Sequence, residues 1–309
     1  MKVIRNIENL PNIVAPIITM GTFDGVHKGH QQILEELNTL KKQLQGESIV
    51  LSFYPHPRKL IQGASVPLLN TLSEKIALLA QAEVDYLVLI PFNRHFADMS
   101  PENYVADFLV ANFHPQCIVI GYDHRFGKNR EGDIHLLKKL APQYHFQVKE
   151  ISAQTVAEIS VSSTKIRRAL LAGQIEKAND LLGYNYALTG TVVAGEQLGR
   201  TLGFPTANLD WEESEKLLPA NGIYIAQADV MEKTYAALVN VGVRPTVSDS
   251  GQRSVEVYLL DFDGDLYGKQ LRVHFLQRIR DEVKFDTIVD MQKQMLHDKE
   301  KAYAYFNKS

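Results

Sequence analysis

The chain has 309 residues, of which 45% are hydrophobic and 22% are charged, and its formal net charge is −3. This composition is typical of a folded globular protein, and the length favours two domains. The balanced charge argues against a nucleic-acid-binding protein, and no apolar run approaches the roughly 20 residues of a membrane span. Cys117 is the only cysteine, which excludes intrachain disulfides and cysteine-ligated metal clusters. The first ten residues lack the apolar block of a signal peptide. These features favour a cytoplasmic location. We expect a monomer or weak homo-oligomer whose partners are small molecules, not nucleic acid or membrane.

Residues 1–184 alternate apolar runs with amphipathic segments. Runs of strand length occur at residues 16–20, 48–53, 86–90, 117–120 and 146–151. Helical spacing or a helix-start signal occurs at residues 33–44, from Ser73, from Ser100, and at residues 134–140. This alternation predicts a parallel sheet with helices on both faces, which binds ligands beyond the carboxyl ends of its strands. Cys117 falls in a predicted buried strand and is expected to be an inert core thiol. Four scattered histidines are expected to be surface or structural residues: His95, His114, His135 and His145.

The rest of the chain has a different pattern. After a helical stretch at residues 164–182, short β-branched and aromatic segments are separated by glycine or asparagine turns, at residues 187–193, 223–230, 235–241, 254–260 and 271–275. This pattern predicts a small antiparallel barrel or sandwich, closed by a helix at residues 287–306. We place the domain boundary between residues 184 and 185. Neither domain, 1–184 nor 185–309, has the basic excess of a nucleic-acid-binding protein.

The segment from Gly21 to His30 joins the first predicted strand to the first helix. Gly21, Gly25 and Gly29 allow the backbone to turn and to approach a ligand closely. The amino-terminal end of the following helix favours an anion, and His27 and His30 can donate to phosphate oxygens. The chain has no P-loop lysine motif. The segment suits attack on an α-phosphate with pyrophosphate leaving, a reaction that depends on orientation and charge stabilisation.

Two other interpretations of this segment stay open. Asp24, His27 and His30 follow each other at three-residue spacing, which could align them as metal ligands on one helical face. The segment could also be an ordinary strand-to-helix turn.

Three further segments support a nucleotide site. Residues 53–57 (Phe-Tyr-Pro-His-Pro) and 121–127 (Gly-Tyr-Asp-His-Arg-Phe-Gly) follow predicted strands, and residues 162–167 (Ser-Ser-Thr-Lys-Ile-Arg) open a helix. Hydroxyls and cations at a helix start suit phosphate binding, although a capped helix with solvated charges would look the same.

Together these motifs resemble the bacterial bifunctional riboflavin kinase/FMN adenylyltransferases, also called FAD synthetases, over essentially the whole chain. His-x-Gly-His at residues 27–30 is shared by a broad nucleotidyltransferase superfamily, and residues 53–57 and 162–167 narrow it to the FMN-adenylylating branch. The resemblance implies an α/β fold with a Rossmann-like nucleotidyltransferase domain at residues 1–184. Residues 185–309 would form a riboflavin kinase domain, a small antiparallel β-barrel with a terminal helix.

The resemblance also implies roles for residues of the first domain. His27 and His30 would contact the ATP phosphates, with Gly21, Phe23, Asp24 and Gly29 in the same binding segment. The implied closing residues are Ser163, Thr164 and Arg167, and Asp123 would lie near the isoalloxazine ring and ATP. The family more often has Asn at Thr22 and Phe at His124, two departures that concern the ribose and flavin contacts.

A second glycine-rich segment opens the second domain, and the implied ligand-binding residues there are Gly195, Gly199, Arg200, Gly203, Asn240 and Arg244. Thr206 and Asn208 offer neutral oxygen ligands two residues apart, which suffice for Mg²⁺ when phosphates supply the negative charge. Considered without the resemblance, Pro-Thr-Ala-Asn is more often a plain turn. The resemblance implies that Thr206 and Asn208 hold nucleotide-bound Mg²⁺. It also implies that Glu256, which alternation alone would turn to solvent, is the general base.

The expected function is therefore phosphorylation of riboflavin to FMN by ATP, followed by adenylylation of FMN by a second ATP to give FAD and pyrophosphate. One alternative is a nucleotidyltransferase for another phosphorylated cofactor precursor, with the barrel as a specificity module. Another is a flavin-binding sensor that has lost catalysis.

Overall fold

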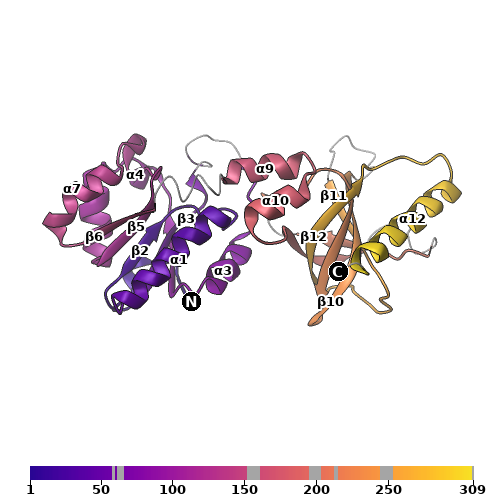
Figure 1. Ribbon diagram of the computed structural model, residues 1–309, viewed down its shortest axis with the longest axis horizontal. Coiled ribbons are helices and arrows are strands. Elements are labelled where there is room, and N and C mark those ends of the chain that lie inside the picture. The colour runs from indigo at the N-terminus through magenta and orange to yellow at the C-terminus, as the bar shows by residue number, and fades with distance from the viewer. Residues whose placement is uncertain are drawn as a thin grey trace. The chain divides into compact units, whose positions relative to one another are not determined.

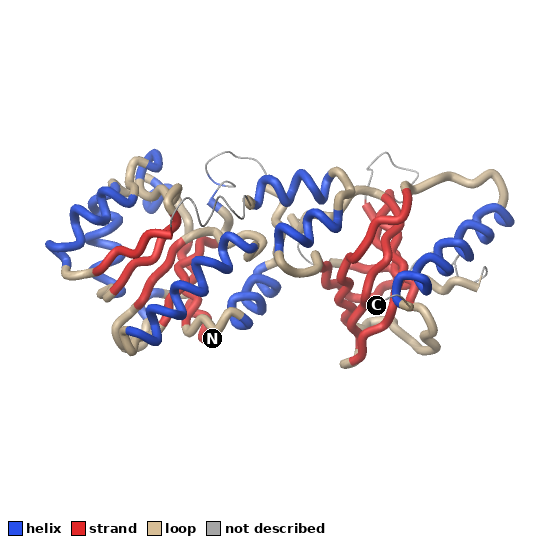
Figure 2. The backbone as a smooth tube through the Cα atoms, viewed as in Figure 1, coloured by secondary structure: helices blue, strands red, loops and turns tan. Residues whose placement is uncertain are grey.

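The computed structural model describes residues 1–57, 60, 66–151, 161–194, 203–211, 215–243 and 253–307. The chain forms two compact units, Met1–Ser163 and Thr164–Ser309, drawn in Figure 1 and, by secondary structure, in Figure 2. Four residues expected to bind ligand lie outside the described residues: Gly195, Gly199, Arg200 and Arg244. Within the described ranges, no helix combines the length and apolar character needed to cross a membrane.

A six-stranded parallel sheet forms the centre of the first unit, in the strand order β1-β4-β3-β2-β5-β6. The strands are β1 (Lys2–Ile4), β2 (Ile17–Met20), β3 (Ser48–Tyr54), β4 (Tyr86–Pro91), β5 (Cys117–Gly121) and β6 (Gln147–Ile151). The longer helices are α1 (Lys28–Gln43), α3 (Leu72–Gln81) and α7 (Ile134–Tyr144). The shorter helical segments are η1 (Ile7–Asn9), α4 (Arg94–Ala97), α5 (Pro101–Asn103), the π-helical η2 (Tyr104–Val110), α6 (Ala111–Phe113) and η3 (Lys128–Arg130). The predicted parallel sheet is confirmed.

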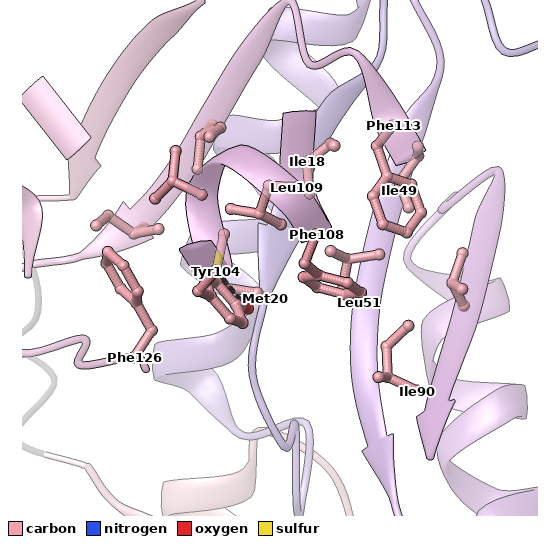
Figure 3. Packing of buried hydrophobic residues seen from close by; sticks show 14 of the residues in the cluster. Ile18, Met20, Ile49, Leu51, Ile90, Tyr104, Phe108, Leu109, Phe113 and Phe126 are labelled. Atoms are coloured by element: carbon pink, nitrogen blue, oxygen red, sulfur yellow. Dashed lines mark hydrogen bonds between the residues drawn. The ribbon is translucent and has the colours of Figure 1, made fainter. Parts of the chain in front are cut away.

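Successive residues of the strands pack against helices on opposite faces of this sheet. On one face, Ile18 belongs to a buried cluster with Phe108 of η2, shown in Figure 3, to which α7 also contributes. On the other face, Ile17 packs with Leu37 of α1 and Leu79 of α3. Strands covered on both faces favour apolar residues at nearly every position, which explains the nearly continuous apolar runs in the sequence. Each such large apolar side chain contributes roughly 1.5–3 kcal/mol by its burial.

The second unit is a closed antiparallel barrel in the order β10-β11-β8-β7-β12-β9, so the barrel alternative is confirmed over the sandwich. Its strands are β7 (Ala187–Val193), β8 (Ala207–Asp210), β9 (Gly222–Val230), β10 (Lys233–Val243), β11 (Arg253–Leu259) and β12 (Gln270–Arg280). Its helices are α9 (Ser163–Leu171), which begins at the unit boundary, α10 (Ile175–Leu182) and the terminal α12 (Ile288–Phe306).

Helix α12 covers part of the outer surface of the barrel. Ala302 of this helix packs against Ile225 of β9 and Leu238 of β10. In β11 the side chains of Val255 and Val257 are buried, whereas Glu256 between them is partly exposed. Strand alternation therefore places Glu256 on the outer surface of the barrel.

The structure differs from the sequence-based prediction at three places. The helical stretch at residues 164–182 is two helices, because Gly173 between them has a φ of +71° and ends the first. Two short strands, β1 and β8, were not predicted, and β8 includes residues interpreted as a turn. The helix that begins after Ser100 continues through a π-helical segment as far as Phe113.

Residues outside the predicted sites lie as expected. His95, His114, His135 and His145 are all exposed. Cys117 is buried in β5, and burial raises the pKa of its thiol to about 11, so the thiol stays protonated at neutral pH.

Candidate active sites

The segment from Gly21 to His27 leaves the carboxyl end of β2, at the point where the strand order of the sheet changes direction. β2 has β3 on one side and β5 on the other, and the chain builds outward from this pair in both directions. Ligands of doubly wound sheets bind in the crevice at such a switch point. The segment after β5 leaves the same edge, so the topology brings Asp123 and the residues of the Gly21–His27 segment to one edge of the sheet.

The backbone of this segment is held in an unfavourable conformation. Phe23, Gly25 and Val26 have φ values of +47°, +89° and +33°. Only glycine adopts such angles without strain. Phe23 and Val26 must therefore be held in this conformation by the burial of their side chains. Gly29 serves close packing instead, since a Cβ on it would lie 3.3 Å from the ring of His27. The segment is therefore a fixed structure set by its surroundings, not an ordinary turn.

His27 and His30 form a stacked pair at the start of α1. Their ring centroids are 3.7 Å apart with an interplanar angle of 12°. His27 caps the helix, its Nδ1 accepting a 3.4 Å hydrogen bond from the main-chain N–H of His30. An accepting Nδ1 places the ring proton of neutral His27 on Nε2, which makes that atom a donor. Nδ1 of His30 is buried and has no hydrogen-bond partner among the described residues.

The pKa of His30 is lowered well below its ordinary value. Burial is the largest cause, followed by the charges of His27 and Lys75. At neutral pH His30 is therefore an uncharged imidazole that can still donate one hydrogen bond. Two stacked imidazoles at the amino-terminal end of a helix form a site suited to an anion.

Asp24 anchors the segment from within. Its carboxylate accepts hydrogen bonds from the main-chain N–H groups of Leu69, at 2.9 Å, and Asn70, at 3.4 Å. Its main-chain carbonyl accepts a 2.9 Å hydrogen bond from the Ser163 hydroxyl. In the described part of the chain, no group of three His, Cys, Asp or Glu residues is arranged to hold a metal ion. The alternative interpretation of Asp24, His27 and His30 as metal ligands is therefore wrong.

Lys75 of α3 is part of this site, although the sequence pattern gave no reason to select it. Its side chain is buried, and Nζ donates a 2.8 Å hydrogen bond to the main-chain carbonyl of Thr22. A lysine in the first turns of an amphipathic helix is normally solvated, and only the fold turns this one inward.

The other predicted residues of the first site have different environments. Asp123 is exposed. His124 is partly exposed, but its Nε2 is buried without a partner among the described residues, and burial lowers its pKa to about 4. Thr164 is exposed and Arg167 half-buried, both in α9 of the second unit. Ser163 contacts the Gly21–His30 segment through its hydrogen bond to the main-chain carbonyl of Asp24.

A row of polar side chains crosses three strands on the outer surface of the barrel. Glu256 of β11 is directly opposite Asn208 of β8 and, on its other side, Asn240 of β10. Directly opposed residues have Cβ atoms about 4.5–5.5 Å apart on the same face of the sheet. The hydroxyl of Thr206, just before β8, donates a 3.1 Å hydrogen bond to Oε2 of Glu256. The structure thus brings together Thr206, Asn208, Asn240 and Glu256.

The oxygen atoms of this row suit a cation. All four side chains are partly exposed, and Oδ1 of Asn240 is buried with no hydrogen-bond partner in the described ranges. Hydroxyl, amide and carboxylate oxygens are the ligands that Mg²⁺ prefers. Gly203, which precedes the row, has a φ of +81°, and a side chain there would meet no atom of the described residues within 4 Å.

Comparison with known proteins decides the family. The family model "FAD synthetase" matches residues 12–165, and the model "Riboflavin kinase" matches residues 182–306. A relative from Escherichia coli (strain K12), named "Bifunctional riboflavin kinase/FMN adenylyltransferase", is 37% identical over 314 residues, which cover 99% of this chain and 98% of the relative. A relative of the same name from Listeria monocytogenes is 36% identical and covers 94% of this chain and 93% of its own length. The chain belongs to the bifunctional riboflavin kinase/FMN adenylyltransferase family.

The two sites fall in different parts of this bifunctional enzyme. The Gly21–His30 segment lies within the FAD synthetase match, and the row around Glu256 lies within the riboflavin kinase match. A solved structure from Streptococcus pneumoniae, titled "Crystal Structure of Macrolide-efflux Protein", has the same fold. It matches with a TM-score of 0.85 and 29% identity over 97% of both chains.

Proposed function

We propose that the two reactions of this enzyme use two separate sets of residues, the Gly21–His30 segment and the row around Glu256. The chain phosphorylates riboflavin with ATP to give FMN. It then transfers AMP from a second ATP to FMN, giving FAD and pyrophosphate. We assign the first reaction to residues 185–309 and the second to residues 1–184.

In the kinase reaction, Glu256 accepts the proton of the ribityl 5′-hydroxyl as the oxygen attacks the γ-phosphorus of ATP. The new oxygen–phosphorus bond forms while the bond from the γ-phosphorus to the ADP oxygen breaks. The hydrogen bond from Thr206 fixes one carboxylate oxygen of Glu256, and the other accepts the proton. Asn240, with its buried amide oxygen, borders the flavin or the nucleotide, and Gly203 lies in the same barrel.

Thr206 and Asn208 are the residues that would hold Mg²⁺ in this site. They fit the ion because both are neutral oxygen ligands beside a carboxylate, and Thr206 uses its proton toward Glu256, which leaves its oxygen lone pairs available. When bound, Mg²⁺ neutralises the charge on the transferring phosphate.

In the adenylyl transfer, an FMN phosphate oxygen attacks the α-phosphorus of ATP, and the bond from the α-phosphorus to pyrophosphate breaks. His27, through Nε2, and His30 donate to the charge that develops around the α-phosphorus, next to the amino-terminal end of α1. Gly21 and Gly29 allow close approach, and Phe23 and Asp24 fix the backbone. Ser163, Thr164 and Arg167 close over the phosphates, and Asp123 lies near the isoalloxazine ring.

The observation that carries the proposal is the stacked pair of His27 and His30 in one unit and the Thr206–Glu256 hydrogen bond in the other. The experiment is incubation of the chain with riboflavin, ATP and Mg²⁺, with the flavins resolved by chromatography over time. FMN should form first and FAD later, and leaving out Mg²⁺ should stop FMN formation. If FMN accumulated and no FAD formed, the Gly21–His30 segment could not be assigned to the adenylylation of FMN.

The proposed partners of the chain are these small molecules alone, and we propose a cytoplasmic monomer or weak homo-oligomer. A single cysteine in 309 residues supports a reducing compartment. Light scattering at increasing protein concentration tests the oligomeric state.

A further inference from the structure

We propose that Lys75 is a positioning residue for adenylyl transfer, which holds the Gly21–His30 segment through the carbonyl of Thr22 and places a fixed positive charge beside His27 and His30. The inference rests on the proposed function of that segment. It adds a residue from a different element, α3, about 45 positions further along the chain.

The amine of Lys75 is held in place by a well-defined helix start. Thr71 and Glu74 form a reciprocal capping box at the beginning of α3, and Lys75 follows directly. Its side chain is only 8% exposed, although lysine is rarely buried because its ammonium group loses hydration. The 2.8 Å hydrogen bond from Nζ to the Thr22 carbonyl replaces part of that hydration. A buried ammonium group fixed on a capped helix is a rigid support.

Lys75 and the residues just before α3 hold the segment on both sides of Phe23. On one side, the Thr22 carbonyl accepts the bond from Lys75 and a second one, at 3.3 Å, from the hydroxyl of Ser52. On the other side, the main-chain N–H groups of residues 69 and 70 hold the carboxylate of Asp24. Phe23 lies between these anchors at a positive φ, and its ring centroid is 4.9 Å from that of His30. A displaced Thr22 carbonyl would therefore turn Phe23 and move the imidazole that contacts it.

The charge of Lys75 acts on the same imidazole. The charged or titratable groups that lower the pKa of His30 are His27 from the same segment and Lys75 from α3, in addition to burial. The ring of Phe23 against it is uncharged, and the carboxylate of Asp24 is engaged by main-chain N–H groups. Lys75 thus disfavours protonation of His30. A protonated His30 would be repelled by both neighbours, which would disrupt the stacked pair.

The test compares three variants of the full chain in FAD formation from FMN, ATP and Mg²⁺, measured from acidic to neutral pH. Lys75→Met keeps the length of the side chain and removes its charge, whereas Lys75→Arg keeps a charge and donors. Lys41→Met is the matched control, because Lys41 is a largely buried lysine of the same unit that pairs with Asp85 at 3.1 Å near the carboxyl end of α1. Hydrogen exchange of β2 and β5 in the same preparations reports whether the first unit of each variant is folded, and riboflavin phosphorylation reports on the second unit.

Lys75→Met should lower kcat for FAD formation by about 10- to 100-fold, since small displacements of reacting groups have effects of that size. The acid limb of its pH–kcat profile, where activity falls as the pH falls, should move to higher pH. The reason is that the pKa of His30 rises when the neighbouring charge is lost. Lys75→Arg should restore the wild-type acid limb and part of kcat. Lys41→Met should leave both unchanged, and all three variants should phosphorylate riboflavin normally.

Three results would overturn the role of Lys75. The first is a wild-type kcat and acid limb in Lys75→Met. The second is a loss in Lys75→Arg as large as in Lys75→Met, with the same movement of the acid limb. The third is a loss of both activities in the two variants, which would make Lys75 a general structural residue. A failure of the proposed function is distinguishable, because the wild-type chain itself would then form no FAD from FMN. In that case the proposed role of Lys75 would be wrong as well.

Discussion

The hydroxyl of Thr206 donates a 3.1 Å hydrogen bond to the carboxylate of Glu256. This bond joins a residue assigned to metal binding to the residue assigned as the base, and it crosses from the start of β8 to β11. It orients the carboxylate and directs the oxygen lone pairs of Thr206 away from Glu256, so loss of the hydroxyl should affect both tasks at once.

We therefore expect Thr206→Val to raise the Mg²⁺ concentration needed for half-maximal riboflavin phosphorylation. The increase should be about 10- to 100-fold, the range found for groups that hold or orient metal ligands. Thr206→Ser should retain most of the activity, because it keeps the hydroxyl. The same change at Thr191, an exposed threonine of β7, is the matched control and should have little effect. Initial rates of FMN formation at a series of Mg²⁺ concentrations measure this. An unchanged Mg²⁺ dependence in Thr206→Val would exclude Thr206 as a ligand.

Asn240 should show opposite effects on stability and activity. Its Oδ1 is buried without a partner among the described residues, and an unsatisfied buried acceptor costs roughly 1–3 kcal/mol. Asn240→Leu should therefore raise the unfolding temperature while lowering kcat/KM for riboflavin phosphorylation about tenfold or more. The contrast is Asn221→Leu, which should destabilise the barrel because Oδ1 of Asn221 accepts a 2.9 Å bond from Arg253. Thermal unfolding and kinase assays on both variants test this, and lower stability in Asn240→Leu would contradict it.

The imidazole of His124, whose Nε2 is buried, should make the first unit less stable in acid. Its pKa is about 4 in the folded chain, because of burial, against an ordinary value of 6.5. Between those values the unfolded chain binds a proton that the folded chain does not, so stability present above pH 6.5 is lost as the pH falls toward 4. The linkage amounts to about 2 kcal/mol between pH 7.5 and 5.

His124→Phe should remove that part of the pH dependence. Hydrogen exchange of β2 and β5 at the two pH values reports on the first unit alone. His95→Phe, at an exposed histidine of α4, is the control and should keep the wild-type pH dependence. Equal pH dependence in the wild type and His124→Phe would contradict the account.

Much of the fold could be predicted because its signals are local. The apolar runs of the parallel sheet follow from burial on both faces, and the alternation in β11 follows from a barrel with one buried face. Gly173 could not be recognised as a helix break, because a single glycine inside a periodic stretch does not reveal a φ of +71°. Strand β8 was hidden because it has only four residues, Ala207–Asp210, and forms only through its pairing with β7 and β11.

The residue types of the first site could be predicted from the sequence, but the residues that hold the site in place could not. The glycines, His27 and His30 are close in sequence, so their spacing alone indicates an anion site. Lys75 and the amides of residues 69 and 70 come from a distant segment, and only the fold brings them to Thr22 and Asp24. The stacking of the two imidazoles likewise depends on the backbone held by Phe23 and Val26.

The division of labour between the two sites is tested most directly by assaying Glu256→Ala and His30→Ala for both products. Glu256→Ala should lose riboflavin phosphorylation by at least about 100-fold and still convert added FMN to FAD at the wild-type rate. His30→Ala should make FMN normally and lose FAD formation to a similar extent. If either substitution abolished both activities in a folded chain, or removed only the activity assigned to the other site, the two reactions would not be divided as we describe.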